Sequence, residues 1–344
     1  MNQLLAFLAF GLSMHLGGLP VYGGLVLLLV TSVTYLRVRS RPAYNQLPNE
    51  IVERPPGARL LGPPQPALPE ARKDLDFALL SQAAYDQTPY GKKNKRSNVR
   101  SAEVDLAARG WSIWPAFGQN NGLPDKLQTA HLRAQVWIKK SENAVAVTFG
   151  GTVVGNEKDW ISNLRWFIPF HEDEYTETVR IFGPAFAEEF AKDIRGQIPE
   201  PALVRLYSTG HSLGGGLAQQ FAYSLPVRPN VPRVYKVFAY DPSPVTGYFS
   251  VNSTVRRRNK TGLLIDRIYE RGEILAYVRS IINFFHTPSA KNAEIRQVRY
   301  NLFDTVNPFS GHSISELAAK LWDLIYPPSA KAPAAVLWRR PKMW

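Results

Sequence analysis

The chain has 344 residues and no cysteine, which excludes disulfides, thiolate metal sites and a cysteine nucleophile. Hydrophobic residues make up 45% of the sequence and aromatic residues 12%, which is enough apolar material for a globular core. Lysine and arginine number 41 against 28 acidic residues, a net charge of +13. No nucleic-acid-binding motif is visible and the basic runs lack interleaved aromatics, so we do not expect a nucleic-acid partner.

The amino-terminal segment, residues 4–36, contains no Asp, Glu, Lys or Arg. It is longer than the roughly 20 residues that cross a bilayer and shorter than two comfortable spans. We therefore expect residues 1–38 to be a membrane anchor, either one transmembrane span over 19–38 or a short helical hairpin that turns at Pro20. A cleavable signal peptide fits poorly, because no positive side chain precedes the apolar run.

Positive charges follow the apolar run and none precedes it, so the positive-inside rule predicts that the main domain lies on the cytoplasmic side of the membrane. The charges are Arg37, Arg39 and Arg41. Residues 42–69 hold eight prolines, which predicts a semi-rigid linker over 39–70. The main domain is expected over 71–327, followed by a basic tail over 328–344.

From about residue 134 onward, segments with strand periodicity alternate with segments of helical periodicity. This alternation predicts an α/β fold, a mostly parallel sheet with helices on both faces. Helices are expected over 75–85, 182–194 and 313–324. Strands are expected over 134–138 and 144–149, which form a hairpin, and over 203–207, 234–240 and 263–269.

The pattern G-x-S-x-G occupies residues 210–214, between the strand at 203–207 and an apolar helical segment that follows Gly216. A strand that turns into a helix within about five residues forces the central serine into a strained conformation. Glycines on either side remove the Cβ atoms that would clash in so tight a turn. This context predicts Ser212 as a nucleophile, against the alternative of a glycine-rich helix start.

A serine nucleophile needs a histidine base and a carboxylate that holds the histidine, in the chain order serine, acid, histidine for such sheets. His286 and His312 are the histidines that follow Ser212. His312 lies in a loop just before the final helix, from which a base can reach the edge of the sheet. It is favoured over His286, whose aromatic neighbours suit packing or a lid.

The acid has to lie in a loop after a later strand. Asp266 and Glu270 fall within or at the edge of a strand and are interpreted as ordinary solvated charges. Glu273 follows Gly272 just beyond the strand end, where a loop can direct a carboxylate at a histidine. Asp241, which also ends a strand, is the alternative.

Over roughly residues 75–325 the chain resembles the class 3 lipase family of α/β-hydrolases. The elbow TGHSLGG at 209–215 matches the family's pattern, and four further blocks follow the family's order. They are VAVTFGGT at 145–152, DWISNL at 159–164, VFAYDPSPVTG at 237–247 and RIYERGEIL at 267–275. Gly150 stands where the family has an arginine, and Glu273 stands where it has an aspartate.

The resemblance implies Ser212 as nucleophile, Glu273 as acid and His312 as base. It also implies that the backbone N–H groups of Thr152 and Leu213 form the oxyanion hole. Residues 160–170 fall where the family carries a lid over the acyl-binding groove, and a buried helix is the alternative interpretation. The expected lid or groove residues are Trp160, Leu164, Trp166 and Phe167.

Together these features predict a membrane-anchored serine hydrolase that cleaves carboxylic esters of lipids, acylglycerol or phospholipid, through an acyl-enzyme. A thioesterase or acyltransferase with the same triad, and a catalytically silent membrane-bound binding module, are the alternatives. The excess positive charge fits attraction to an anionic phospholipid surface, with solvated basic loops as the alternative. No metal, organic cofactor or specific protein partner is expected.

Overall fold

The structure is a computed structural model, and it describes residues 47–86, 102–114, 117, 132–151, 178–243, 246–273, 275, 279, 287–303 and 310–327. The predicted anchor over 1–38 and the predicted basic tail over 328–344 lie outside these residues. Within the described ranges, no helix has both the length and the apolar character needed to cross a bilayer.

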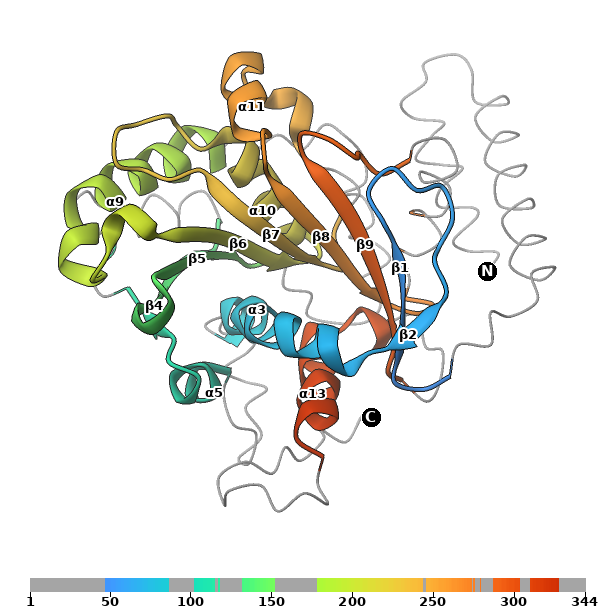
Figure 1. Cartoon of the computed structure of the whole chain (residues 1–344). Coiled ribbons are helices and arrows are strands. Elements are labelled where there is room, and N and C mark those ends of the chain that lie inside the picture. Colours follow the sequence, from blue (N-terminus) through green and yellow to red (C-terminus); the bar gives the residue numbers. More distant parts are fainter. Residues whose placement is uncertain are drawn as a thin grey trace, which may run out of the picture.

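A nine-stranded mixed sheet runs through the described part of the chain, in the order β2-β1-β9-β8-β7-β6-β5-β4-β3 (Figure 1). The central strands β5 to β9 are parallel, and each lies beside its predecessor in sequence. Antiparallel strands flank them at both edges. The predicted α/β class and the hairpin of β4 and β5 are therefore confirmed. The strands are β1 (Glu50–Arg54), β2 (Pro64–Pro66), β3 (Ser112–Ile113), β4 (Ala134–Lys139), β5 (Ala144–Phe149), β6 (Arg205–His211), β7 (Val234–Tyr240), β8 (Leu264–Glu270) and β9 (Glu294–Asn301).

Helices cover both faces of the sheet, as the sequence predicts (Figure 1). Crossovers between parallel strands are right-handed, so successive crossovers in one direction place their helices on one face. That face carries α9 (Gly183–Gln197), α10 (Leu213–Ser224) and α11 (Ser253–Asn259). The opposite face is covered by helices from the two ends of the domain: α3 (Leu68–Asp86), α5 (Ala102–Ala108) and α13 (Ile314–Ile325).

The two faces bury separate apolar clusters, because side chains alternate along each strand. On β5, Val145 and Val147 belong to the cluster beneath α9 and α10, while Ala144 and Ala146 belong to the cluster beneath α3 and α13. A strand that is buried on both faces reads as a continuous apolar run, which is how β5 reads in the sequence.

The segment predicted as a proline-rich linker forms part of the sheet, so that prediction is wrong from Glu50 to Pro66. Strand β1 pairs antiparallel with β9, and Ile51 and Val52 are buried. Strand β2 (PQP) lies at the edge, where proline is tolerated because its missing N–H costs no ladder hydrogen bond. The folded domain therefore begins well before residue 71.

A buried group of charges joins α3 to the sheet. Arg296 on β9 donates to Asp266 on β8 at 2.9 and 2.6 Å, and it also contacts Glu70 on α3. Burial alone would raise the pKa of Asp266, but the hydrogen bonds and charges of Arg296 and Lys236 hold it below the usual 3.8. The interpretation of Asp266 as a solvated charge is wrong, because its carboxylate is buried and paired with Lys236 and Arg296. These partners lie on β7 and β9, which are distant in sequence, so the pairing is not visible in the sequence.

Replacing Arg296 with methionine is expected to lower the free energy of unfolding by about 3–5 kcal/mol, since Glu70 and Asp266 would stay buried without their shared partner. Urea unfolding followed by circular dichroism measures this change. Arg257→Met, at an exposed position on α11, is the control and should change stability by no more than about 0.5 kcal/mol. Equal stability of the two variants would contradict the assigned role of Arg296.

Candidate active site

The turn between β6 and α10 holds Ser212 in a conformation that side chains rarely adopt, with φ 58° and ψ −123°. The Ser212 N–H donates to the carbonyl of Tyr240 at 2.9 Å. A Cβ atom on Gly210 would lie 2.3 Å from the carbonyl oxygen of Gly214, and one on Gly214 would lie 2.2 Å from that of Phe149. The G-x-S-x-G segment therefore forms the strand–turn–helix elbow that its sequence predicts.

His312 and Glu273 meet beyond the carboxyl ends of the parallel strands. Nδ1 of His312 lies 3.0 Å from Oε2 of Glu273, and the N–H of Leu275 donates to the same oxygen at 2.8 Å. An ionised carboxylate only accepts hydrogen bonds, so Nδ1 carries the proton and Nε2 is the basic nitrogen. The structure thus brings the predicted base and acid together in the tautomer that a general base requires.

His211, the residue before Ser212, binds the backbone of His312. Its Nε2 donates to the carbonyl oxygen of His312 at 2.7 Å, and the two ring centroids lie 4.8 Å apart. With Nε2 as the donor, Nδ1 accepts from the hydroxyl of Tyr85 on α3, at 3.0 Å. The end of β6 and helix α3 therefore hold His312 next to the elbow.

Burial keeps both histidines neutral at neutral pH. It lowers the pKa of His312 to about 3, and the positive charge of Arg279 acts in the same direction. Burial also lowers the pKa of His211 well below 6.5, with a further contribution from His312. A neutral imidazole can accept a proton, and the imidazolium that then forms is stabilised by the adjacent Glu273 carboxylate.

Asp241, the alternative acid, is fully buried at the end of β7. Its Oδ2 lies 3.8 Å from Nε2 of His211, too far for a hydrogen bond. Burial raises the pKa of Asp241 to about 8, so the carboxyl is largely protonated at neutral pH. A triad acid has to be negatively charged when the imidazolium forms, and the geometry therefore favours Glu273 over Asp241.

Glu270, at the end of β8, is buried. It accepts from the N–H of Leu302 at 3.0 Å, and burial raises its pKa to about 7 despite bonds from three backbone N–H groups. The interpretation of Glu270 as a solvated charge is wrong, because the loop after β9 covers it.

Leu213 is the first residue of α10, so its N–H lies at the positive end of the helix beside Ser212. Its predicted partner in the oxyanion hole, Thr152, lies outside the described residues. So do the other side chains expected at the groove and the alternative base, which remain predictions: Trp160, Leu164, Trp166, Phe167 and His286.

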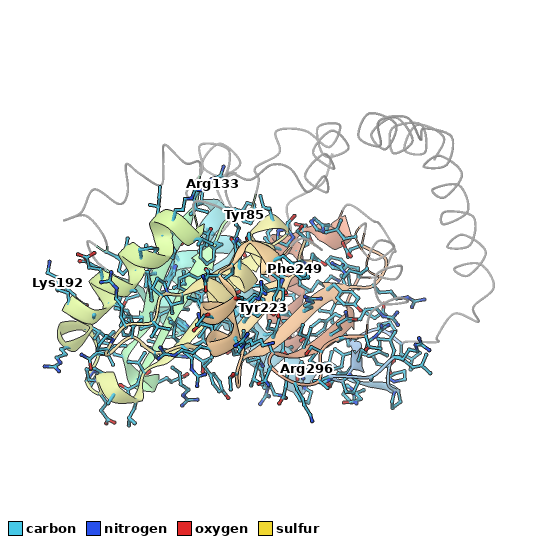
Figure 2. The ribbon with its side chains drawn as sticks, turned by 90° about the horizontal axis from the view of Figure 1, so that it is seen from above. Tyr85, Arg133, Lys192, Tyr223, Phe249 and Arg296 are labelled. Carbon is cyan, nitrogen blue, oxygen red and sulfur yellow. The ribbon has the colours of Figure 1, made fainter. Side chains whose placement is uncertain are left out.

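Two side chains labelled in Figure 2, Arg133 and Tyr85, lie against the backbone of Gly151, just before Thr152. Arg133 donates through Nη1 to the carbonyl of Gly151 at 3.2 Å. A Cβ atom on Gly150 would lie 3.1 Å from Cβ of Arg133. The class 3 lipase pattern has an arginine at the position of Gly150. The lack of a side chain at Gly150 leaves room for Arg133, which directly precedes β4.

Among the residues that the structure describes, two groups of side chains have ligand atoms close enough to hold a cation: His211 with Asp241 and His312, and Glu70 with Asp74 and Asp266. In the first group, His211, Asp241 and His312 each have an atom within 4.8 Å of the others. However, Nε2 of His211 already donates to the carbonyl oxygen of His312. In the second, Glu70 and Asp266 are neutralised by Arg296. We interpret both groups as internal hydrogen-bond and ion-pair networks.

Comparison with known proteins adds a family match. The model of the phospholipase-like family, described as a Tle-like phospholipase domain, matches residues 76–226, which include α3 and the elbow. Residues 76–226 are therefore similar to a phospholipase-like domain. This match supports an ester hydrolase of the lipase kind. No curated protein matches the chain.

Solved structures of fungal lipases resemble the chain at low identity. The lipase–propeptide complex of Rhizomucor miehei is 16% identical, with a TM-score of 0.39 over 61% of this chain and 63% of that one. The Rhizopus microsporus var. chinensis lipase is 13% identical, with a TM-score of 0.39 over 72% and 85%. Lipase II of Rhizopus niveus is 13% identical, with a TM-score of 0.35 over 62% and 77%. The match thus spans less than two thirds of the first of these proteins.

Glu273→Gln is expected to lower kcat on the order of 10⁴-fold, because an amide in place of the acid favours the wrong imidazole tautomer. Steady-state hydrolysis of a short-chain ester, with circular dichroism to verify folding, measures the loss. Asp241→Asn is the matched control and should lose far less. The reverse ranking would assign the acid to Asp241.

Gly151→Ala is expected to lower kcat on the order of 10²-fold by displacing the backbone before Thr152. The new Cβ atom would lie 2.3 Å from the Tyr85 hydroxyl and 2.8 Å from the His211 carbonyl. Gly196→Ala, in α9 with nothing within 4 Å, is the control and should keep full activity. Adding Tyr85→Phe to Gly151→Ala should recover part of the rate. Unchanged activity of the single variant would show that this backbone plays no part.

Proposed function

We propose that the protein is a membrane-anchored serine hydrolase that cleaves carboxylic esters of lipids. The observation that carries the proposal is the elbow at Ser212 beside a buried His312 whose Nδ1 lies 3.0 Å from Glu273. In this proposal Ser212 is the nucleophile, His312 the base and Glu273 the acid. The match to a phospholipase domain supports a lipid ester as the substrate class.

The reaction would proceed through an acyl-enzyme. Nε2 of His312 takes the proton of Ser212 as Oγ attacks the ester carbonyl, and Glu273 stabilises the resulting imidazolium. The N–H of Leu213, with that of Thr152 in the proposed role, binds the developing oxyanion. The alcohol leaves with the proton from His312, and water then attacks the acyl-enzyme by the same route.

The position at which the chain enters the domain supports action at a membrane. Leu47 accepts through its carbonyl from Asn301 at 2.9 Å, so the entry point lies at the carboxyl end of β9. The carboxyl ends of parallel strands share one edge, and three strand spacings of about 4.8 Å separate β9 from the elbow strand β6. The apolar run over 4–36 therefore leads to the edge that holds Ser212.

The distance between the apolar run and the domain is also short. Residues 37–46 span at most about 36 Å when fully extended. With the apolar run in a bilayer and the main domain on the cytoplasmic side, this tether would keep the carboxyl edge close to the lipid surface. Phospholipid and acylglycerol esters are the substrates that such an arrangement presents.

Labelling of the purified protein by a fluorophosphonate probe tests the proposal. Wild type should be labelled, and Ser212→Ala and His312→Ala should not, because the probe needs an activated serine. Ser224→Ala, at the other end of α10, is the control and should label fully. Unlabelled wild-type protein is then assayed with phospholipid, acylglycerol and thioester substrates, with and without an alcohol acceptor.

Failure of wild type to label in detergent would favour a non-catalytic binding module. Normal labelling of His312→Ala would transfer the role of base to His286. Release of thioesters or transfer to the alcohol, without hydrolysis of lipid esters, would favour the thioesterase or acyltransferase alternative.

A further inference from the structure

A buried arginine lies against the side of Glu273 that faces away from His312. Arg279 is 6% exposed and its guanidinium contacts Oε1 of Glu273. The other oxygen, Oε2, holds His312 and the N–H of Leu275. One oxygen of the carboxylate thus contacts the imidazole of His312, and the other contacts the guanidinium of Arg279.

The same arginine reaches the loop that follows β7. Its Nη1 donates to the carbonyl of Pro242 at 3.2 Å, and the next residue, Ser243, donates its N–H to the carbonyl of Ser212 at 3.0 Å. The guanidinium also lies 4.5 Å from the ring centroid of Tyr269. One side chain therefore connects the loop of the acid with the loop that holds the nucleophile.

Arginine is suited to this position, because its planar guanidinium presents several donors in fixed directions and stacks on aromatic rings. The side chain of Glu273 is longer by one methylene than the aspartate that the class 3 lipase pattern has at this position. A longer side chain has one more rotatable bond, and a contact on the second oxygen removes that freedom.

We propose that Arg279 is a positioning residue that fixes the Glu273 carboxylate on His312 and sets the basicity of His312. This inference rests on the proposed hydrolase function, and it concerns a residue that does not touch the reacting atoms.

The charges that face His312 come from three neighbouring strand ends. His211 at the end of β6 is neutral, because burial lowers its pKa. Asp241 at the end of β7 is protonated below about pH 8. Burial raises the pKa of Glu270, at the end of β8, to about 7. Below about pH 7, Glu273 and Arg279 are therefore the charged groups at these strand ends that act on His312.

Arg279 lowers the pKa of His312. Its positive charge disfavours the imidazolium and lowers the pKa of His312, in addition to the larger effect of burial. Removing that charge leaves the negative Glu273 unopposed, so the pKa of His312 rises. The acid limb of kcat/KM, which reports the free base, then moves to higher pH.

The experiment compares Arg279→Met and Arg279→Lys with wild type in full-length protein, in detergent, on a short-chain ester. Arg279→Met should lower kcat by about 10- to 100-fold with little change in KM, because the acid is displaced by a fraction of an ångström. Its acid limb should lie at higher pH than that of wild type. Arg279→Lys keeps the charge, so it should recover part of kcat and leave the acid limb in place.

Arg256→Met is the matched control. Arg256 also stacks on a tyrosine, at 4.3 Å from the ring centroid of Tyr248, and donates to a backbone carbonyl. Arg256 is part of α11, and its partner Tyr248 contacts Tyr223, near the end of α10 that is far from Ser212. This variant should keep the kcat and the pH profile of wild type.

A double variant keeps the test valid if Arg279→Met folds poorly. Glu273→Gln with Arg279→Met leaves no buried charge unpaired at this contact, and it should lose no more activity than Glu273→Gln alone, since Arg279 acts through Glu273. Additive losses, or an unmoved acid limb in Arg279→Met, would overturn the proposal. Wild-type labelling by fluorophosphonate separates this outcome from a failure of the hydrolase function itself.

Discussion

The positive φ of Ser212 is the constraint on which the rest of the site depends. A non-glycine residue adopts this conformation at a cost of about 1–3 kcal/mol, so its surroundings have to enforce it. Here the carbonyl of Ser212 accepts from Gly215, Gly216 and Ser243, and its N–H donates to Tyr240. Helix α10 and the end of β7 therefore both hold the turn, and the bare backbone of Gly210 and Gly214 lets them approach.

Near this turn, the cost of burying a negative charge is offset by the partners of Glu273. A carboxylate taken out of water needs compensation, and Glu273 receives it from an imidazole, a backbone N–H and a guanidinium. Asp241 lies close by without such hydrogen bonds, and burial raises its pKa instead. Two acids at adjacent strand ends thus differ in charge because their partners differ.

The sequence alone predicts the elbow and the positions of Glu273 and His312. The elbow is a contiguous motif, and Glu273 and His312 follow it at positions where strand ends and the family resemblance agree. Contacts between distant segments were not readable in the same way. Arg133 and Tyr85 flank Gly151 from other elements, and no pattern in the sequence relates them to it. The prolines around β1 hide its strand pattern, and β9, which carries charges at 294, 296 and 299, lacks the continuous apolar run of β5.

The pairing of the first strand with the last determines the order in which the domain can be assembled. Ile51 pairs with Tyr300, and α3 packs against α13. Chains are synthesised from the amino terminus, so α3 and the elbow emerge long before their partners. His312 directly precedes α13 and joins the site at this last stage. In the proposed function, a nascent or truncated chain would therefore contain the nucleophile without its base, and it would be inert until synthesis of the domain is complete.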